Sequence, residues 1–194
     1  MKKNRFSQKI KTLLTLIAIM WIVLAVNFFI FHNSLLHYGI APRSVSGLIG
    51  IFFAPFLHAN KVHLTSNTVP FLILGYLSMR NGTGEFYSVF IVSMITSGLG
   101  TWIIGSSGTV HIGASGIVFG LFGYLLLKGY FQRKPISIIT SILVAFLYGG
   151  MIFGILPKYP GVSWQCHLFG FLGGILAAKT MSRRITINTN NINY

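Results

Sequence analysis

TVHIGASGIVFGLFGYLLL, residues 109–127, places a serine between two glycines at the mouth of a long apolar run. In lipid, a small residue flanked by glycines lets two helices pack closely. The same residue, held where a helix begins, could instead be a nucleophile. Whether Ser115 is a packing residue or a catalytic one depends on what the remaining residues place around it.

The composition is that of a membrane protein. Hydrophobic residues make up 53% of the 194 residues and charged residues 8%, whereas a soluble domain has about 25% charged residues. The formal charge of +14 would suggest a nucleic-acid partner in a soluble chain, but here the cations lie between apolar runs instead of along one face. We therefore expect the partner to be a lipid bilayer and not a nucleic acid.

The carboxylate count excludes several catalytic mechanisms. The chain has no Asp, and Glu85 is its only Glu. A pair of catalytic aspartates, an H-E-x-x-H zinc site and a Ser-His-Asp triad are therefore all excluded. We expect neither a metal ion nor a cofactor. Cys166 is the only cysteine, so no intramolecular disulfide can form.

Six segments are apolar and long enough to span a membrane as helices, which takes about 20 residues. They cover residues 13–31, 63–79, 86–106, 114–131, 136–156 and 163–179. The sequence thus predicts an all-α polytopic membrane protein, with a cytoplasmic basic N-terminus at 1–11, a six-helix membrane domain at 12–180 and a cytoplasmic polar tail at 181–194. The apolar segment 32–62, broken by glycine and proline, is expected to lie partly embedded in the outer interface.

The distribution of basic residues predicts the orientation. With the N-terminus in the cytoplasm, twelve cations lie inside and three outside, as the positive-inside rule requires. The inside set is Lys2, Lys3, Arg5, Lys9, Lys11, Arg80, Lys128, Arg133, Lys134, Lys179, Arg183 and Arg184, and the outside set is Arg43, Lys61 and Lys158. We expect an integral protein of a bacterial cell membrane with both termini in the cytoplasm.

This orientation brings the polar residues of three spans to one depth. His63 and Asn67 open the second span, and Ser115 opens the fourth. His167 lies a few residues into the sixth, and all three spans start on the outer face, so these side chains lie within about 10 Å of the outer surface. Each alone could be a helix contact or an interhelical hydrogen-bonding group. Because histidine and asparagine are costly to leave unpaired in lipid, their conjunction predicts one polar site.

Two pairs of glycines would let the fourth and sixth spans approach closely. They are Gly116 with Gly120 on the fourth span and Gly170 with Gly174 on the sixth. If these pairs face each other, Ser115 and His167 come within the ~2.6–3.2 Å that a nucleophile and its base require. Phe119, one turn below Ser115, would then stack on the imidazole.

A serine–histidine dyad is the hydrolytic mechanism that remains without a carboxylate. Histidine titrates near neutrality, so it can accept the proton of Ser115 and return it to a leaving amine. His63, Asn67 and the backbone N–H of Ser115 are the candidate donors to the developing oxyanion.

Three motifs make the chain resemble the rhomboid family of intramembrane serine proteases over nearly its whole length. They are HANKVHLTSN at 58–67, GASG from Gly113 to Gly116, and HLFGFLGG at 167–174, in the order that the family has. The resemblance implies Ser115 as nucleophile, His167 as general base, and His63 with Asn67 around the oxyanion. It also implies a six-helix core with a partly embedded first loop, and a fifth helix and a PKYPGVS loop (157–163) that open for transmembrane substrates.

The function that follows is an intramembrane serine endopeptidase that cleaves transmembrane helices near the outer membrane boundary. The alternative is a non-catalytic rhomboid-like protein that binds and escorts such helices, but the retained serine and histidine favour the protease. A transporter or channel is disfavoured, because no span carries an intramembrane carboxylate or a continuous polar stripe. The resemblance departs in the first loop, where many members carry a Trp-Arg pair. Here Pro42 precedes Arg43 and the loop has no Trp, so its anchoring stays open.

Overall fold

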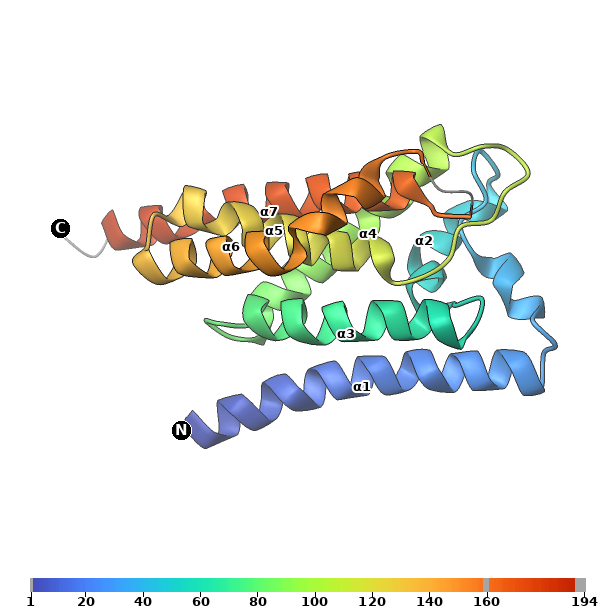
Figure 1. Cartoon of the computed structure of the whole chain (residues 1–194), viewed down its shortest axis with the longest axis horizontal. Coiled ribbons are helices and arrows are strands. Elements are labelled where there is room, and N and C mark those ends of the chain that lie inside the picture. The colour runs from blue at the N-terminus through green and yellow to red at the C-terminus, as the bar shows by residue number, and fades with distance from the viewer. Residues whose placement is uncertain (1, 159–160, 191–194) are drawn as a thin grey trace.

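The computed structural model describes the backbone of residues 2–158 and 161–190 (Figure 1). Over these residues the chain forms seven α-helices, of which six are long. The long helices are α1 (Lys2–Phe29), α3 (Lys61–Ser78), α4 (Thr83–Ile104), α5 (Ser115–Gln132), α6 (Pro135–Tyr148) and α7 (Trp164–Asn190). The first loop contains the 3-10 helices η1 (Ser34–Tyr38), η2 (Ser46–Leu48) and η3 (Ala54–Phe56) and the short α2 (Gly50–Phe53), and a further 3-10 helix, η4 (Gly149–Ile155), continues α6.

The predicted all-helical fold is confirmed, and each of the six predicted segments coincides with a long helix. Three helices among the described residues, Arg5–Phe29, Thr83–Ile104 and Pro135–Ile155, are long and apolar enough to cross a membrane by length and composition. α7 continues to Asn190 and so passes the predicted boundary at residue 180. Residues 191–194 of the predicted tail, and Tyr159 and Pro160 of the predicted PKYPGVS loop, lie outside the described part of the chain.

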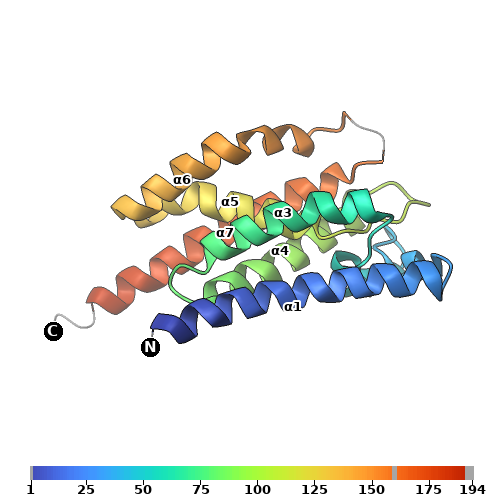
Figure 2. The ribbon, with the colours of Figure 1, turned by 60° about the horizontal axis from the view of Figure 1, so that its bottom comes forward.

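α5 lies at the centre of the bundle, packed against α3, α4, α6 and α7 (Figure 1 and Figure 2). Every residue of α5 from Gly116 to Leu125 is buried. Its glycines remove side-chain volume where neighbouring helices approach, so the helix can be covered on all sides. α6 lies at the periphery and exposes a row of apolar side chains that includes Ile139, Ile142 and Phe146. Such a surface is typical of a helix that faces lipid or a partner.

The contact between α5 and α7 is made by glycines, as the sequence predicts. A Cβ atom at Gly170 would collide with the backbone oxygen of Gly116, and one at Gly174 would collide with that of Gly120. The two glycine pairs therefore face each other with their backbones in contact. In lipid, burial of apolar surface does not drive helices together, so close packing of this kind supplies much of the attraction.

The first loop is fastened to the end of α4 by Arg43 and by a tryptophan that the loop does not itself contain. The Arg43 guanidinium donates to the Gly105 carbonyl (2.8 Å), and the Arg43 N–H donates to the Trp102 carbonyl (3.1 Å). The Trp102 indole N–H in turn donates to the Ser44 carbonyl (2.8 Å). Because the tryptophan comes from α4, the loop is anchored without a Trp of its own.

Glu85, the only carboxylate side chain, is a structural group remote from Ser115. It accepts hydrogen bonds from Lys128 Nζ (3.0 Å) and from Asn81 Nδ2 (2.7 Å), and so links α4 to α5. The side chains of Lys128 and Glu85 are only 4% and 10% exposed. Lys128 lies thirteen residues after Ser115 in α5, which corresponds to about 20 Å along the helix.

Gly174→Val is expected to destabilise the protein, because a branched side chain has no room against the Gly120 backbone. Overpacking costs ~1–3 kcal/mol and more where a backbone must move. Thermal melting in mild detergent measures the effect. Gly84→Val is the matched control, since a Cβ atom at Gly84 meets nothing within 4 Å. Equal melting of the two variants would show that the glycines do not set the spacing of α5 and α7.

Glu85→Gln is also expected to destabilise the protein, because it leaves Lys128 as a buried, unpaired cation. Breaking a buried ion pair from one side costs about 3–5 kcal/mol, whereas replacing both partners is often close to neutral. Thermal melting should therefore show a clear loss for Glu85→Gln and recovery of most of that loss when Lys128→Met is added. A double variant no more stable than the single one would contradict this account of the pair.

Candidate active site

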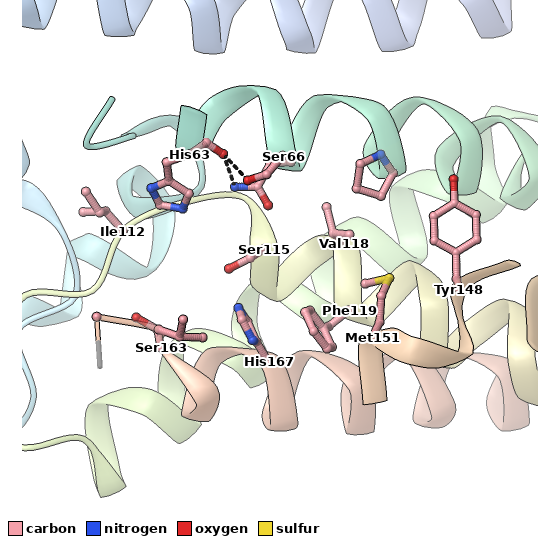
Figure 3. A pocket seen from close by; sticks show the side chains of 14 residues that line it. His63, Ser66, Ile112, Ser115, Val118, Phe119, Tyr148, Met151, Ser163 and His167 are labelled. Carbon is pink, nitrogen blue, oxygen red and sulfur yellow. Dashed lines mark hydrogen bonds between the residues drawn. The ribbon is translucent and has the colours of Figure 1, made fainter. Parts of the chain in front are cut away.

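A pocket of about 420 Å³ opens among α3, α5, η4 and α7. Its polar lining is His63, Ser66 and Asn67 from α3, Ser115 from α5, Tyr148 from the end of α6, Ser163 just before α7, and His167 within α7. Figure 3 shows Ser115 and the His167 ring on facing walls of this pocket. The four residues predicted for the site, which come from three separate helices, therefore line one cavity.

Ser115 is the first residue of α5 and is half-buried. The turn before it is held on the first loop by paired backbone hydrogen bonds between Ile40 and His111 (both 2.9 Å) and by a bond from the Gly113 N–H to the Ala54 carbonyl (2.8 Å). Gly113 has a φ of 111°, a conformation that residues with a side chain rarely adopt. The first glycine of GASG is thus required for the tight turn that delivers Ser115 to the pocket.

His58, the first residue of the HANKVHLTSN motif, supports the same turn from the buried side. Its Nε2 accepts a hydrogen bond from the Ala114 N–H (3.3 Å), so the imidazole is neutral and carries its proton on Nδ1. Burial, followed by the proximity of His63, lowers the pKa of His58 to about 4. The low pKa keeps His58 neutral, as a hydrogen-bond acceptor for this turn must be.

His167 is oriented by uncharged groups. In the neutral imidazole its Nδ1 donates to the Gly154 carbonyl (2.9 Å), and because a carbonyl can only accept, Nε2 keeps the lone pair of a base. The Phe119 ring stacks on the imidazole with centroids 4.1 Å apart and planes inclined by 7°, as the sequence predicts. These two contacts fix the tautomer and the plane of the ring, which a carboxylate helps to do in a catalytic triad.

Ser115 and His167 lie on facing walls of the pocket, but the predicted hydrogen bond between them is not formed. Among the described residues, the Ser115 hydroxyl has no hydrogen-bond partner. In enzymes without substrate such bonds are often long or poorly aligned, and they tighten when substrate binds. The two groups therefore lie on one cavity as neighbours and not as a bonded pair.

His63 and Asn67 face the turn before Ser115. A Cβ atom at Gly113 would lie 2.7 Å from His63 Nε2 and 3.7 Å from Asn67 Nδ2. Asn67 Nδ2 donates one hydrogen to the His63 carbonyl (3.1 Å), which leaves its second hydrogen for another acceptor. The N–H of Ser115 lies in the first turn of α5, where backbone donors have no partner within the helix. Several donors thus converge beside the candidate nucleophile.

His111 joins the loop before α5 to the start of α7. The Thr109 hydroxyl donates to the Ser106 carbonyl (2.6 Å), so it accepts from His111 Nε2 (2.9 Å), and His111 Nδ1 accepts from the Ser163 hydroxyl (2.8 Å). Burial lowers the pKa of His111, which favours this neutral form. The Ser163 carbonyl accepts from the His167 N–H (3.2 Å). His111 therefore holds the residue from which the first turn of α7 begins.

Three residues of this arrangement, Gly154, His111 and Ser163, were not predicted from the sequence. Gly154 acts through its backbone carbonyl, which every residue has, so no residue type signals it. His111 stands four residues before Ser115 and could have been suspected from that proximity. Its partner Ser163 is 52 residues away along the chain, and only the fold brings the two together.

The chemistry available to the pocket is that of hydroxyl, imidazole and amide groups. Within residues 2–158 and 161–190, no group of three His, Cys, Asp or Glu side chains is arranged to hold a metal ion. A hydroxyl beside a neutral imidazole and several N–H donors suits nucleophilic attack on a carbonyl followed by proton transfer.

Comparisons with known proteins identify the family. The Rhomboid domain model matches residues 45–184. An uncharacterized protein of Mycobacterium tuberculosis is 45% identical over 152 residues, which cover 74% of this chain and 63% of that protein, less than two thirds of its length. A putative rhomboid protease of Bacillus subtilis is 33% identical over 123 residues (62% of this chain, 60% of that protein). Rhomboid protease GlpG of Photorhabdus laumondii is 30% identical over 139 residues (69% and 48%). The chain is a polytopic membrane protein that belongs to the Rhomboid domain family.

Proposed function

We propose that this chain is an intramembrane serine endopeptidase that cleaves transmembrane helices of other proteins near the outer membrane boundary. The observation that carries the proposal is the pocket in which Ser115 faces His167, whose Nδ1 proton is held by the Gly154 carbonyl. An imidazole in that tautomer is a base at Nε2. Two relatives, named a putative rhomboid protease and a rhomboid protease, point to the same activity.

In the proposed reaction, His167 Nε2 removes the proton of Ser115 Oγ as that oxygen attacks a substrate carbonyl. The N–H of Ser115, with Asn67 and His63, stabilises the negative charge on the carbonyl oxygen. When the intermediate collapses, His167 gives the proton to the leaving amine, and the acyl group stays on Ser115. A water molecule, deprotonated by the same imidazole, then releases the acyl group and restores the serine.

We propose that all six long helices cross a bacterial cell membrane, with both termini in the cytoplasm. The distribution of twelve cations on one side and three on the other supports this orientation. The first loop is proposed to lie partly in the outer interface, since it exposes Val45 (83% exposed), Ile49, Phe52 and Phe53. We expect lipid to cover these side chains, because their exposure to water would be unfavourable.

The proposed depth of Ser115 defines the substrate class. A transmembrane helix hides its carbonyls in i to i−4 hydrogen bonds, and an unsatisfied backbone group in lipid costs several kcal/mol. The favoured substrates therefore have a segment with Gly, Pro or β-branched residues near the outer boundary, where the helix unwinds at low cost. A small residue such as Ala, Gly or Ser before the cut suits a pocket set among closely packed helices.

The alternative function is a non-catalytic protein that binds and escorts transmembrane helices. The fold alone does not distinguish the two, but an escort needs neither a free hydroxyl nor an oriented base, and this pocket contains both Ser115 and His167. A serine-reactive phosphonate separates the alternatives, because covalent labelling that depends on Ser115 is expected only of a protease.

Ser115→Ala and His167→Ala are each expected to abolish cleavage, and the double variant should be little worse than either, because the two residues act as one unit. Asn67→Ala should lose about 10–1,000-fold, since other donors to the oxyanion remain. The measurement is the cleavage rate of a single-span substrate in reconstituted vesicles, with product termini mapped by mass spectrometry. Cleavage is expected beside a Gly-rich segment near the outer boundary.

Glu85→Gln is the matched control for this experiment and should stay within a few-fold of wild type below its melting temperature. Cleavage by the Ser115→Ala protein would contradict the assignment of Ser115 as nucleophile. A loss of activity of ~100-fold or more in folded Glu85→Gln protein would contradict a dyad that works without a carboxylate. Cleavage that followed a displaced Gly-rich segment into the inner half of the bilayer would contradict the placement of the site.

We further propose His111 as a positioning residue that acts on His167 through Ser163. His111→Val removes the acceptor of the Ser163 hydroxyl and should lower kcat about 10-fold with KM little changed, because small displacements of a catalytic base are costly. His111→Asn, whose amide oxygen can replace Nδ1 as acceptor, should retain most of kcat. Equal losses in the Val and Asn variants, or a loss confined to melting temperature, would leave His111 with a structural role only.

A further inference from the structure

α1 packs along α3 but only lightly against α4 (Figure 2). A groove lies between α1 and α4 near the N-terminal end of α1. The groove has a volume of about 560 Å³. Its polar lining consists of Ser7, Gln8, Lys11, Thr12 and Thr15 from α1 and Tyr87 from α4. Ser7, Gln8 and Lys11 precede the first predicted span at 13–31, so this groove lies where the helix is expected to enter the membrane.

A second groove continues the first along α1 toward the first loop. It has a volume of about 690 Å³ and is lined by Leu16, Ile19 and Val23 on one side and by apolar loop side chains such as Phe53 on the other. Leu16 lines both grooves, so they adjoin. Together they form one path along α1, polar at the N-terminal end and apolar at the other.

The polar groups of the first groove are free for a ligand. In the described part of the chain, Lys11 forms no ion pair and no hydrogen bond, and the hydroxyls of Thr12 and Thr15 have no partner. Several hydroxyls in other helices are bonded to their own backbone instead. Thr68, Thr140 and Thr180 each donate to the carbonyl four residues before them. Unused hydroxyl donors around an unpaired ammonium form a set that suits a phosphate group.

We propose that this path is a binding site for one anionic glycerophospholipid, with the phosphate on Lys11 and the neighbouring hydroxyls and an acyl chain along Leu16, Ile19 and Val23. The polarity of the path matches that of a phospholipid, and the positive charge of Lys11 complements the headgroup. Lys11 and Val23 are about 18 Å apart along the helix, comparable to one leaflet of a hydrocarbon core about 30 Å thick. That this lipid comes from the inner leaflet rests on the orientation proposed above. The binding chemistry itself does not depend on that orientation.

Native mass spectrometry of the purified protein in neutral detergent tests the proposal, with dioleoylphosphatidylglycerol as the anionic lipid and dioleoylphosphatidylcholine as the zwitterionic one. One phosphatidylglycerol should bind more tightly than phosphatidylcholine. Lys11→Gln should weaken phosphatidylglycerol binding about 5-fold, as expected for the loss of one lysine near an anionic headgroup. Lys9→Gln is the matched control, because Lys9 Nζ lies against the Arg80 carbonyl (3.5 Å) and over the Tyr76 ring (5.6 Å), on another face of α1. It should change the affinity less than 2-fold.

Two further arms separate a lipid from a free anion. Val23→Trp fills the apolar groove and should weaken phosphatidylglycerol binding while Lys11 is intact, and millimolar inorganic phosphate should not displace the lipid. Equal effects of Lys11→Gln and Lys9→Gln, equal binding of the two lipids, or full displacement by phosphate would each overturn the proposal. The Ser115→Ala protein should bind lipid as wild type does, so failure of the lipid site and failure of the proteolytic proposal give different results.

Discussion

The close approach of α5 and α7 is the constraint on which the rest of the structure depends. Gly116 and Gly120 meet Gly170 and Gly174 with backbone against backbone. Ser115 directly precedes the first of these glycines, and His167 lies one turn before the third. The distance between the side chains of Ser115 and His167 is therefore set by how closely the helices pack, and not by any bond between the side chains themselves. A side chain at Gly170 or Gly174 would collide with the α5 backbone and move the pair apart, whereas one at Gly116 or Gly120 would first meet Ser97 or Ser93 of α4.

The only carboxylate side chain is paired with Lys128, about 20 Å along α5 from Ser115, so the imidazole of His167 is oriented by uncharged groups. The Gly154 carbonyl and the Phe119 ring are these groups. Nearby, the neutral imidazole of His58 accepts from the Ala114 N–H, and that of His111 accepts from the Ser163 hydroxyl. Burying a carboxylate in a membrane is expensive, so a carbonyl that needs no counter-charge is the less costly partner. The same cost of burying a charge explains why Glu85 is paired with Lys128.

The parts of this fold that could be predicted are those with a local or periodic signal. Apolar runs predicted the long helices, and glycines at a spacing of four predicted the α5–α7 contact. The expected topology predicted that His63, Asn67, Ser115 and His167 lie together, and they line one pocket. Trp102, which anchors the first loop from α4, could not be predicted, because nothing local indicates that its indole reaches Ser44.

Other contacts between distant parts of the chain could not be predicted from the sequence for a related reason. The Gly154 carbonyl carries no residue-specific signal, and the path of the chain after α6 decides which carbonyl reaches His167. The N-terminal helix was predicted as a span, yet its polar groove was missed. A row of hydroxyls on one helix indicates a groove only when the position of the neighbouring helix is known.

The acceptor of the His167 proton belongs to η4, the continuation of α6, which is the helix most exposed at the edge of the bundle. An outward swing of α6 that admitted a substrate helix from the side would carry the Gly154 carbonyl away from the imidazole. The ring would then be free to exchange tautomers or to flip, and Nε2 would no longer be a dependable base. Under the proposed function, this single hydrogen bond would link catalysis to closure of the lateral entrance, and His167 would not activate Ser115 while the entrance is open.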